Sequence, residues 1–190
     1  MTVYRPLICP YAQIISVIGT NAFVYDIGCG GGTLLALLAK YRQPKKLTGH
    51  DVRQDVVDGA RSLVEQVASP MTEVNIFRLE GDSDLQLAGY DYVTLIDVFH
   101  HIPRQSQDSF LRRIYQSMPK GAYLILKDID GGSILRFMNK LHDLLVARQM
   151  VHEVPVKVAR QKLESLGFQV ISETRKNMMW YPHFLIVARK

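Results

Sequence analysis

A glycine-rich turn near the N-terminus limits what this chain of 190 residues can fold into. The turn runs from Asp26 to Gly32 and follows a short apolar stretch, Phe23–Tyr25, while residues 33–40 are typical of a buried helix. Glycine allows a positive φ and a close approach of the backbone to a ligand, and the start of a helix offers free N–H groups. A strand, a glycine turn and a helix start together predict a nucleotide-binding cradle.

The spacing of the glycines distinguishes between nucleotides. The dinucleotide-binding pattern G-x-G-x-x-G requires a third glycine at a position where this chain has Thr33. The chain instead has D-x-G-x-G-x-G from Asp26 to Gly32. This pattern resembles motif I of the class I S-adenosylmethionine (SAM)-dependent methyltransferases that act on small molecules. The resemblance implies that the turn holds SAM as cofactor, with S-adenosylhomocysteine (SAH) as its product.

Segments typical of strands and helices alternate along the rest of the chain. After the first strand, strands are expected at 46–52, 74–79, 90–97, 123–129, 168–172 and 184–189. The remaining helices are expected at 11–18, 55–68, 106–118 and 156–166. This alternation predicts a doubly wound, Rossmann-like α/β sheet. The resemblance adds a seven-stranded sheet in the order 3-2-1-4-5-7-6, with strand 7 antiparallel. We expect a single SAM-dependent methyltransferase domain over residues 1–190.

One segment interrupts this alternation. Between the fifth strand and the last helix the chain inserts residues 131–152, whose apolar side chains fall on one face of an expected amphipathic helix. Such a helix can pack on the core, cover the substrate or rest on a lipid surface. The sequence leaves these three roles open.

Two acidic residues extend the expected cofactor site. An acid at the end of the second strand of a nucleotide-binding fold accepts hydrogen bonds from ribose hydroxyls, and Asp51 has that position. The resemblance implies that Asp82, after the third strand, contacts the amino group of adenine. The full expected set of cofactor-binding residues is Asp26, Gly28, Cys29, Gly30, Gly32, Asp51, Val52, Asp82, Ser83, Asp97 and Val98.

The acceptor is expected beside this site, because ligands of open α/β sheets bind at the carboxyl ends of the strands. An antiparallel seventh strand places the loop 174–183 at that edge, with the two histidines that follow the fourth strand. Methyl transfer mainly needs alignment and exclusion of water, and it needs a base only when the acceptor carries a proton. His100 and His101 are the expected catalytic bases, with His101 favoured. The expected substrate-binding residues are His142, Trp180, Tyr181 and His183.

No metal is expected at this edge of the sheet. His100 and His101 are adjacent in the chain, which gives poor chelating geometry, and no acidic residue stands at ligand spacing from them.

The charge distribution bears on the partners. The formal net charge is +5, with −2 in residues 1–95 and +7 in residues 96–190. A basic C-terminal half leaves open a contact with a membrane surface, a carrier protein or RNA.

Enzymes that methylate the exocyclic amino groups of bases share a [DNS]-P-P-[YFW] segment, and residues 97–100 do not match it, so DNA is not expected. The leading partner is a small apolar, aromatic or lipid-like acceptor. The alternatives are an RNA methyltransferase and a SAM-binding partner protein without turnover.

The expected location is the cytoplasm, with a peripheral contact at the membrane left open. The chain has no uncharged apolar run of about 18 residues and no N-terminal pattern of a secretory signal. Its two cysteines, Cys9 and Cys29, do not form a disulfide framework.

Overall fold

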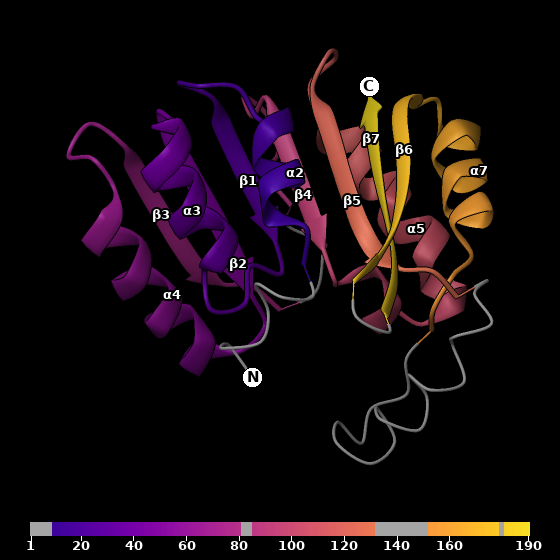
Figure 1. Cartoon of the computed structure of the whole chain (residues 1–190), viewed down its shortest axis with the longest axis horizontal. Coiled ribbons are helices and arrows are strands. Elements are labelled where there is room, and N and C mark those ends of the chain that lie inside the picture. Colours follow the sequence, from indigo (N-terminus) through magenta and orange to yellow (C-terminus); the bar gives the residue numbers. More distant parts are fainter. Residues whose placement is uncertain (1–8, 81–84, 132–151, 179–180) are drawn as a thin grey trace.

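The chain folds into one seven-stranded sheet covered by helices on both faces (Figure 1). This computed structural model describes residues 9–80, 85–131, 152–178 and 181–190. The strands are β1 (Phe23–Ile27), β2 (Lys46–Asp51), β3 (Glu73–Arg78), β4 (Tyr92–Ile96), β5 (Tyr123–Ile129), β6 (Gln169–Met178) and β7 (Tyr181–Arg189). The helices are α2 (Tyr11–Val17), α3 (Thr33–Arg42), α4 (Gln54–Val67), the 3-10 helix η1 (Phe99–His101), α5 (Arg104–Ser117) and α7 (Val156–Leu166).

The strand order is β3-β2-β1-β4-β5-β7-β6, and β7 runs antiparallel to β5 and β6. Both features of the predicted Rossmann-like sheet are therefore confirmed. Strand β1 pairs in parallel with β2 on one side and with β4 on the other. The carboxyl ends of β1, β2, β4 and β5 consequently meet along one edge of the sheet, the lower edge in Figure 1. Ligands of open α/β sheets bind at this edge.

The sheet separates two apolar cores, one on each face. Consecutive side chains of a strand point to opposite faces, and β5 follows this rule, because Leu124 and Leu126 belong to one core and Ile125 to the other. Helices α3 and α4 cover the half of the sheet formed by β1, β2 and β3, whereas α5 and α7 lie beside β5, β7 and β6 (Figure 1). Because the central strands are buried on both faces, they give rigid support to the segments that follow their carboxyl ends.

The last hairpin differs from the sequence-based expectation. The segment 174–183 was expected to be a loop, but β6 continues to Met178 and β7 begins at Tyr181. Pairing extends along the hairpin to the partners Met178 and Tyr181. Backbone hydrogen bonding in the ladder therefore overrides the weak strand pattern of this polar and methionine-rich stretch. Of the inserted segment 131–152, residues 132–151 lie outside the described residues, so the expected amphipathic helix stays a prediction.

We expect Gly32 to be the more costly of two glycines to replace. Gly32 has a φ of 74°, and a Cβ there would lie 2.9 Å from Cβ of Ala60 on α4. Left-handed backbone strain and overpacking together should lower the free energy of unfolding of Gly32→Ala by about 1–3 kcal/mol. Thermal and urea unfolding measure the change.

Gly59 supplies the matched control. It lies inside α4, and a Cβ there would meet no atom within 4 Å. Gly59→Ala should therefore stabilise the protein by about 0.5–1 kcal/mol. Equal stability of the Gly32 and Gly59 variants would contradict the packing described here.

Candidate active site

The glycine turn between β1 and α3 forms a cradle that only glycine backbone fits. Gly28, Gly30 and Gly32 have φ values of 69°, 51° and 74°, all in the left-handed region. A Cβ on Gly28 would lie 2.5 Å from a methyl group of Val98, so the turn touches the segment that follows β4. The turn leads into the start of α3, where backbone N–H groups and the positive end of the helix dipole favour polar or anionic groups of a ligand.

Asp51 ties the end of β2 to the same turn. Its Oδ2 accepts a hydrogen bond from the backbone N–H of Gly30 at 3.0 Å, and its Oδ1 accepts one from the N–H of Arg53 at 3.1 Å. The carboxylate therefore lies beside the glycine turn, as the expected contact with ribose requires. The neighbouring Val52 is 57% exposed.

Two cofactor candidates lie beneath the turn rather than on its surface. Asp26 is 3% exposed, and its Oδ1 accepts a hydrogen bond from the hydroxyl of Thr94 on β4 at 2.6 Å. Cys29 is also buried, and its backbone N–H donates to the carbonyl of His50 at 2.8 Å. Burial, assisted by the charge of Asp26, raises the pKa of the Cys29 thiol well above its usual range, so the thiol stays neutral. Both residues support the cradle from below. Asp82, the expected adenine contact, and Ser83, also expected to bind the cofactor, lie outside the described residues.

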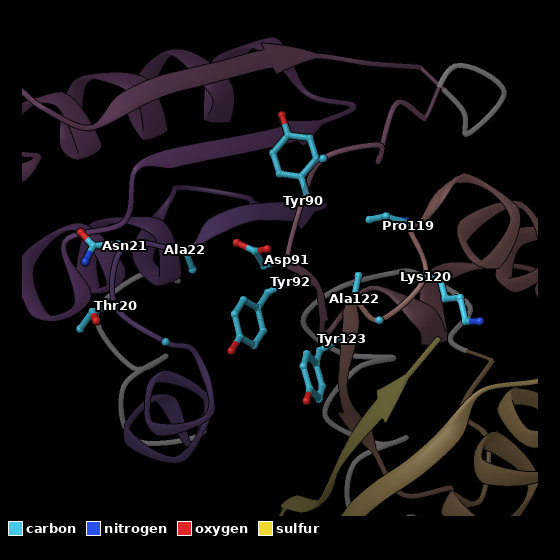
Figure 2. A pocket seen from close by; sticks show the side chains of 13 residues that line it. Thr20, Asn21, Ala22, Tyr90, Asp91, Tyr92, Pro119, Lys120, Ala122 and Tyr123 are labelled. Atoms are coloured by element: carbon cyan, nitrogen blue, oxygen red, sulfur yellow. The ribbon is translucent and has the colours of Figure 1, made fainter.

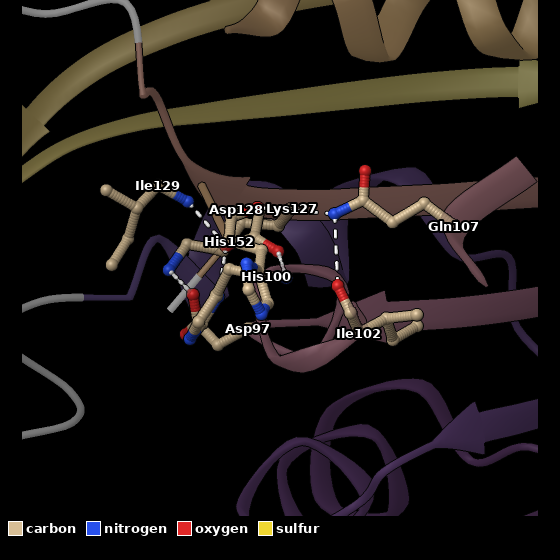
Figure 3. Close-up of polar contacts among 8 residues, drawn as sticks. All are labelled: Asp97, His100, Ile102, Gln107, Lys127, Asp128, Ile129 and His152. Atoms are coloured by element: carbon tan, nitrogen blue, oxygen red, sulfur yellow. Dashed lines mark hydrogen bonds and ion pairs between the residues drawn. The ribbon is translucent and has the colours of Figure 1, made fainter. Parts of the chain in front are cut away.

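A buried histidine–aspartate pair lies at the carboxyl ends of β4 and β5. Nδ1 of His100 is 2.5 Å from Oδ1 of Asp128, and the backbone N–H of His100 donates to Oδ2 of the same carboxylate at 2.9 Å (Figure 3). His100 and Asp128 are 7% and 2% exposed. Burial on its own would lower the pKa of His100, but the Asp128 carboxylate outweighs it and the net shift is upward. Because the carboxylate binds Nδ1–H, Nε2 is the nitrogen that can accept a proton.

His101, the favoured base at the sequence level, has a different setting. It is exposed, and its ring centroid lies 4.0 Å from that of His100. The 3-10 helix η1 turns the first histidine inward and the second outward. The structure therefore gives His100, rather than His101, the geometry of a base oriented by a buried carboxylate.

An ion pair that sequence reasoning missed lies beside the histidine. Lys127 on β5 is fully buried, and its Nζ is 2.5 Å from Oδ1 of Asp97, the residue that follows β4 (Figure 3). Burial on its own would raise the pKa of Asp97, but the charge of Lys127 lowers it below the usual range, so the carboxylate is ionised. Two consecutive charges in an otherwise apolar strand, Lys127 and Asp128, were the signal in the sequence, because buried charges require partners.

Of the expected substrate-binding residues, the structure places His183 in this cluster. It is 4% exposed on β7 and opposite Ile129 in the ladder. Burial, followed by the charge of Lys127, lowers the pKa of His183 to about 4, so it is neutral at physiological pH. Tyr181 begins β7, close to the same edge. His142 and Trp180 lie outside the described residues.

A cavity of about 570 Å³ lies at the opposite edge of the sheet, where the strands begin. The turns 19–22, 89–92 and 119–123 surround it (Figure 2). Tyr92 and Tyr123 stack there with ring centroids 5.5 Å apart, so each ring covers one face of the other. The length of the strands separates this cavity from Asp51 and His100, so it is no part of the cofactor cradle.

No group of three or more His, Cys, Asp or Glu residues in the ranges described above could hold a metal ion. No helix in the described part of the chain is long and apolar enough to cross a membrane.

Comparisons with known proteins show which family this fold and its glycine turn belong to. The model of a methyltransferase domain family matches residues 25–124, which is more than half of the chain. The chain therefore belongs to this family of methyltransferase domains. The prediction of a class I SAM-dependent methyltransferase, made from the glycine turn, is confirmed.

The chain is also similar in sequence to curated proteins called carboxy-S-adenosyl-L-methionine synthases. The carboxy-S-adenosyl-L-methionine synthase of Shewanella oneidensis is 27% identical over 172 residues, covering 82% of this chain and 69% of that protein. The synthase of the same name from Dichelobacter nodosus is 26% identical over 180 residues, covering 88% and 73%.

Solved structures show the same fold. A SAM-dependent methyltransferase from Methanosarcina mazei has a TM-score of 0.74 at 19% identity, covering 94% of this chain and 96% of that one. Magnesium protoporphyrin IX methyltransferase from Synechocystis, with bound SAH, has a TM-score of 0.75 at 19% identity, covering 95% and 82%.

Replacing Asp51 should weaken SAM binding. Asp51→Ala removes a charged hydrogen-bond acceptor beside the turn, which should cost about 1–3 kcal/mol of binding free energy. Titration calorimetry with SAM and with SAH measures the loss. Asp55→Ala is the matched control, because Asp55 is an exposed acid four residues further on that pairs with Arg53. Unchanged SAM affinity in the Asp51 variant, with the same unfolding temperature as the wild type, would remove the ribose assignment.

Proposed function

We propose that this protein transfers the methyl group of SAM to a small apolar or aromatic acceptor whose attacking atom carries a proton, with His100 as the general base. The observation that supports this role is the buried His100–Asp128 pair beside the cofactor cradle. A carboxylate on Nδ1 keeps the imidazole in one tautomer and stabilises the imidazolium that forms when Nε2 takes a proton. A phenol or hydroxyl is the acceptor class that needs such a base.

The position of the pair supports the same role. His100 follows Val98 by two residues, and Val98 touches the turn at Gly28. The base and the cradle are therefore parts of one packed unit, in which an acceptor can be aligned with the sulfonium methyl group of SAM. When bound, SAM supplies that activated methyl group. The residues of this chain bind the cofactor, exclude water and accept the proton.

The names of the curated relatives support a second candidate, the synthesis of carboxy-SAM. The net charge of the described residues around His100 argues against carboxy-SAM synthesis. Asp97, Asp128 and Lys127 sum to −1 while His100 is neutral, and the single cation of this set is already bound to Asp97. An added carboxylate would meet a negative cluster there, whereas a neutral acceptor would not.

Product analysis separates these candidates. The protein is incubated with methyl-labelled SAM and a cell extract that is then fractionated into lipids, small molecules and RNA. Methyl transfer predicts label in the small-molecule or lipid fraction with an equal amount of SAH. Label in RNA supports the RNA alternative, and a SAM derivative with an added carboxyl group supports the synthase. No change in SAM would indicate a binding protein without turnover.

Replacing His100 should reduce turnover far more than replacing His101. With a hydroxyl or phenol acceptor, His100→Gln should lower kcat by about 10²–10⁴-fold, the range for loss of a general base. His101→Gln is the matched control and should change kcat little. SAM affinity should stay near the wild-type value in both variants. The unfolding temperature should fall in His100→Gln, because the buried Asp128 loses the ring that binds it, and should stay near the wild-type value in His101→Gln. Turnover is therefore compared at a temperature at which both variants are folded.

The role of His100 as a base predicts that activity is lost toward low pH. Only unprotonated His100 can accept a proton, and its pKa is raised, so wild-type activity should fall as pH drops through a value above the ordinary 6.5. The deficit of His100→Gln should shrink at high pH, because the acceptor then ionises unaided. A parallel pH profile for the variant and the wild type would mean that His100 is only a packing residue.

A further inference from the structure

Two consecutive residues of β5 hold both ends of the turn that carries His100. At one end, the backbone N–H of Asp97 donates to the carbonyl of Lys127 at 2.9 Å, and the two side chains form the ion pair. At the other end, the backbone and the ring of His100 both bind Asp128 (Figure 3). Asp97 has a φ of 57°, which is unfavourable for a residue with a side chain. The contacts with β5 therefore stabilise this turn at both of its ends.

The charges of this cluster do not balance while His100 is neutral. Asp97 and Asp128 are negative, Lys127 is positive, and His183 is neutral because burial lowers its pKa to about 4. The sum is −1 with His100 neutral and zero with His100 protonated. The two carboxylates raise the pKa of His100 and Lys127 lowers it, so the lysine offsets part of the attraction for a proton.

We propose that Lys127 is a positioning residue that sets the proton affinity of His100, through its ion pair with Asp97 and its charge beneath the turn. With Lys127 present, the base can both take up and release a proton. Without it, protonated His100 would be the remaining cation beside the two carboxylates, so its proton affinity would rise and more of it would stay in the form that cannot act as a base. The use of this tuning in catalysis rests on the proposed function, but the tuning itself is a property of the folded protein.

Other titratable groups lie around His100, and the test leaves them unchanged. The ring of His101 packs against it, and the backbone N–H of His152 donates to its carbonyl at 2.7 Å. Glu153 is buried in the same returning segment, and its carbonyl accepts from Arg104 at the start of α5. These groups are common to all variants, so a difference in the pKa of His100 between variants reports on the substituted charges.

The test is a set of three variants of the full chain, Lys127→Met, Asp97→Asn and the double variant. Histidine ring resonances are titrated by NMR with SAH and without ligand, and His100→Gln assigns the resonance of His100. Lys127→Met should raise the pKa of His100 by about 1–3 pH units, and Asp97→Asn should lower it in the same range. The double variant removes one charge of each sign and should return the pKa close to that of the wild type.

The double variant also controls for stability. Removing one partner of a buried ion pair leaves an uncompensated charge, whereas removing both is often neutral. If Lys127→Met does not fold, Asp97→Asn and the double variant still give the downward shift and the return. A pKa of His100 that is the same in all folded variants would overturn the proposal, as would a downward shift in Lys127→Met.

The titration needs no acceptor, so its outcome is distinguishable from that of the proposed function. Ordered pKa shifts without any methyl transfer would leave the role of Lys127 intact and remove the proposed reaction. Methyl transfer without the expected pKa shifts would support the proposed reaction and overturn the role of Lys127. Once an acceptor is known, the acidic limb of the kcat profile should move in the same direction as the measured pKa in each variant.

Discussion

The packing of the glycine turn against its two neighbours is the constraint on which the rest of the structure depends. The missing side chain of Gly28 leaves room for Val98, and that of Gly32 leaves room for Ala60. The turn is therefore pressed against both the segment after β4 and helix α4. Because close-packed backbone cannot shift without moving its neighbours, the cofactor cradle and the segment with His100 share one rigid frame. Alignment of a methyl donor with an acceptor, the main requirement of this chemistry, needs such a frame.

The second constraint is electrostatic and lies one strand further along the sheet. Charged groups are costly to bury, and proteins retain them where they are paired or where they act. Here the pairs join β5 to the segment after β4, at the edge where a ligand binds, rather than in the centre of either apolar core. Stability alone would favour apolar side chains at these positions. A cluster of buried charges at this edge is what the proposed role of His100 as a base would require.

The glycine cradle and the doubly wound sheet could be predicted because their signals are local, whereas the strand order came from the family that the glycine turn resembles. Glycine spacing, the alternation of elements and the acid at the end of β2 are all visible within short windows of sequence. The burial of Lys127 and its pairing with Asp97 could not be predicted from a short window of sequence. They depend on β4 and β7, which flank β5 and come from distant parts of the chain. The same holds for the choice between His100 and His101. Adjacent histidines look alike in the sequence, and the single turn of η1 decides which ring faces inward.

The alternation of side chains along β5 has a consequence for how this strand can change. Lys127 and Asp128 occupy consecutive positions and so act from opposite faces of the sheet, with Ile96 of β4 opposite Lys127. A one-residue slip of β5 against β4 would exchange the two faces, placing like charges together and removing the partner of His100. A two-residue slip would restore the faces but carry both groups about 7 Å along the strand, past the residues they hold. The alignment of β4 with β5 is thus encoded in charge as well as in hydrophobic pattern, so a single-residue insertion or deletion in this strand would break the contacts of Asp97 and His100 together with the packing of both cores.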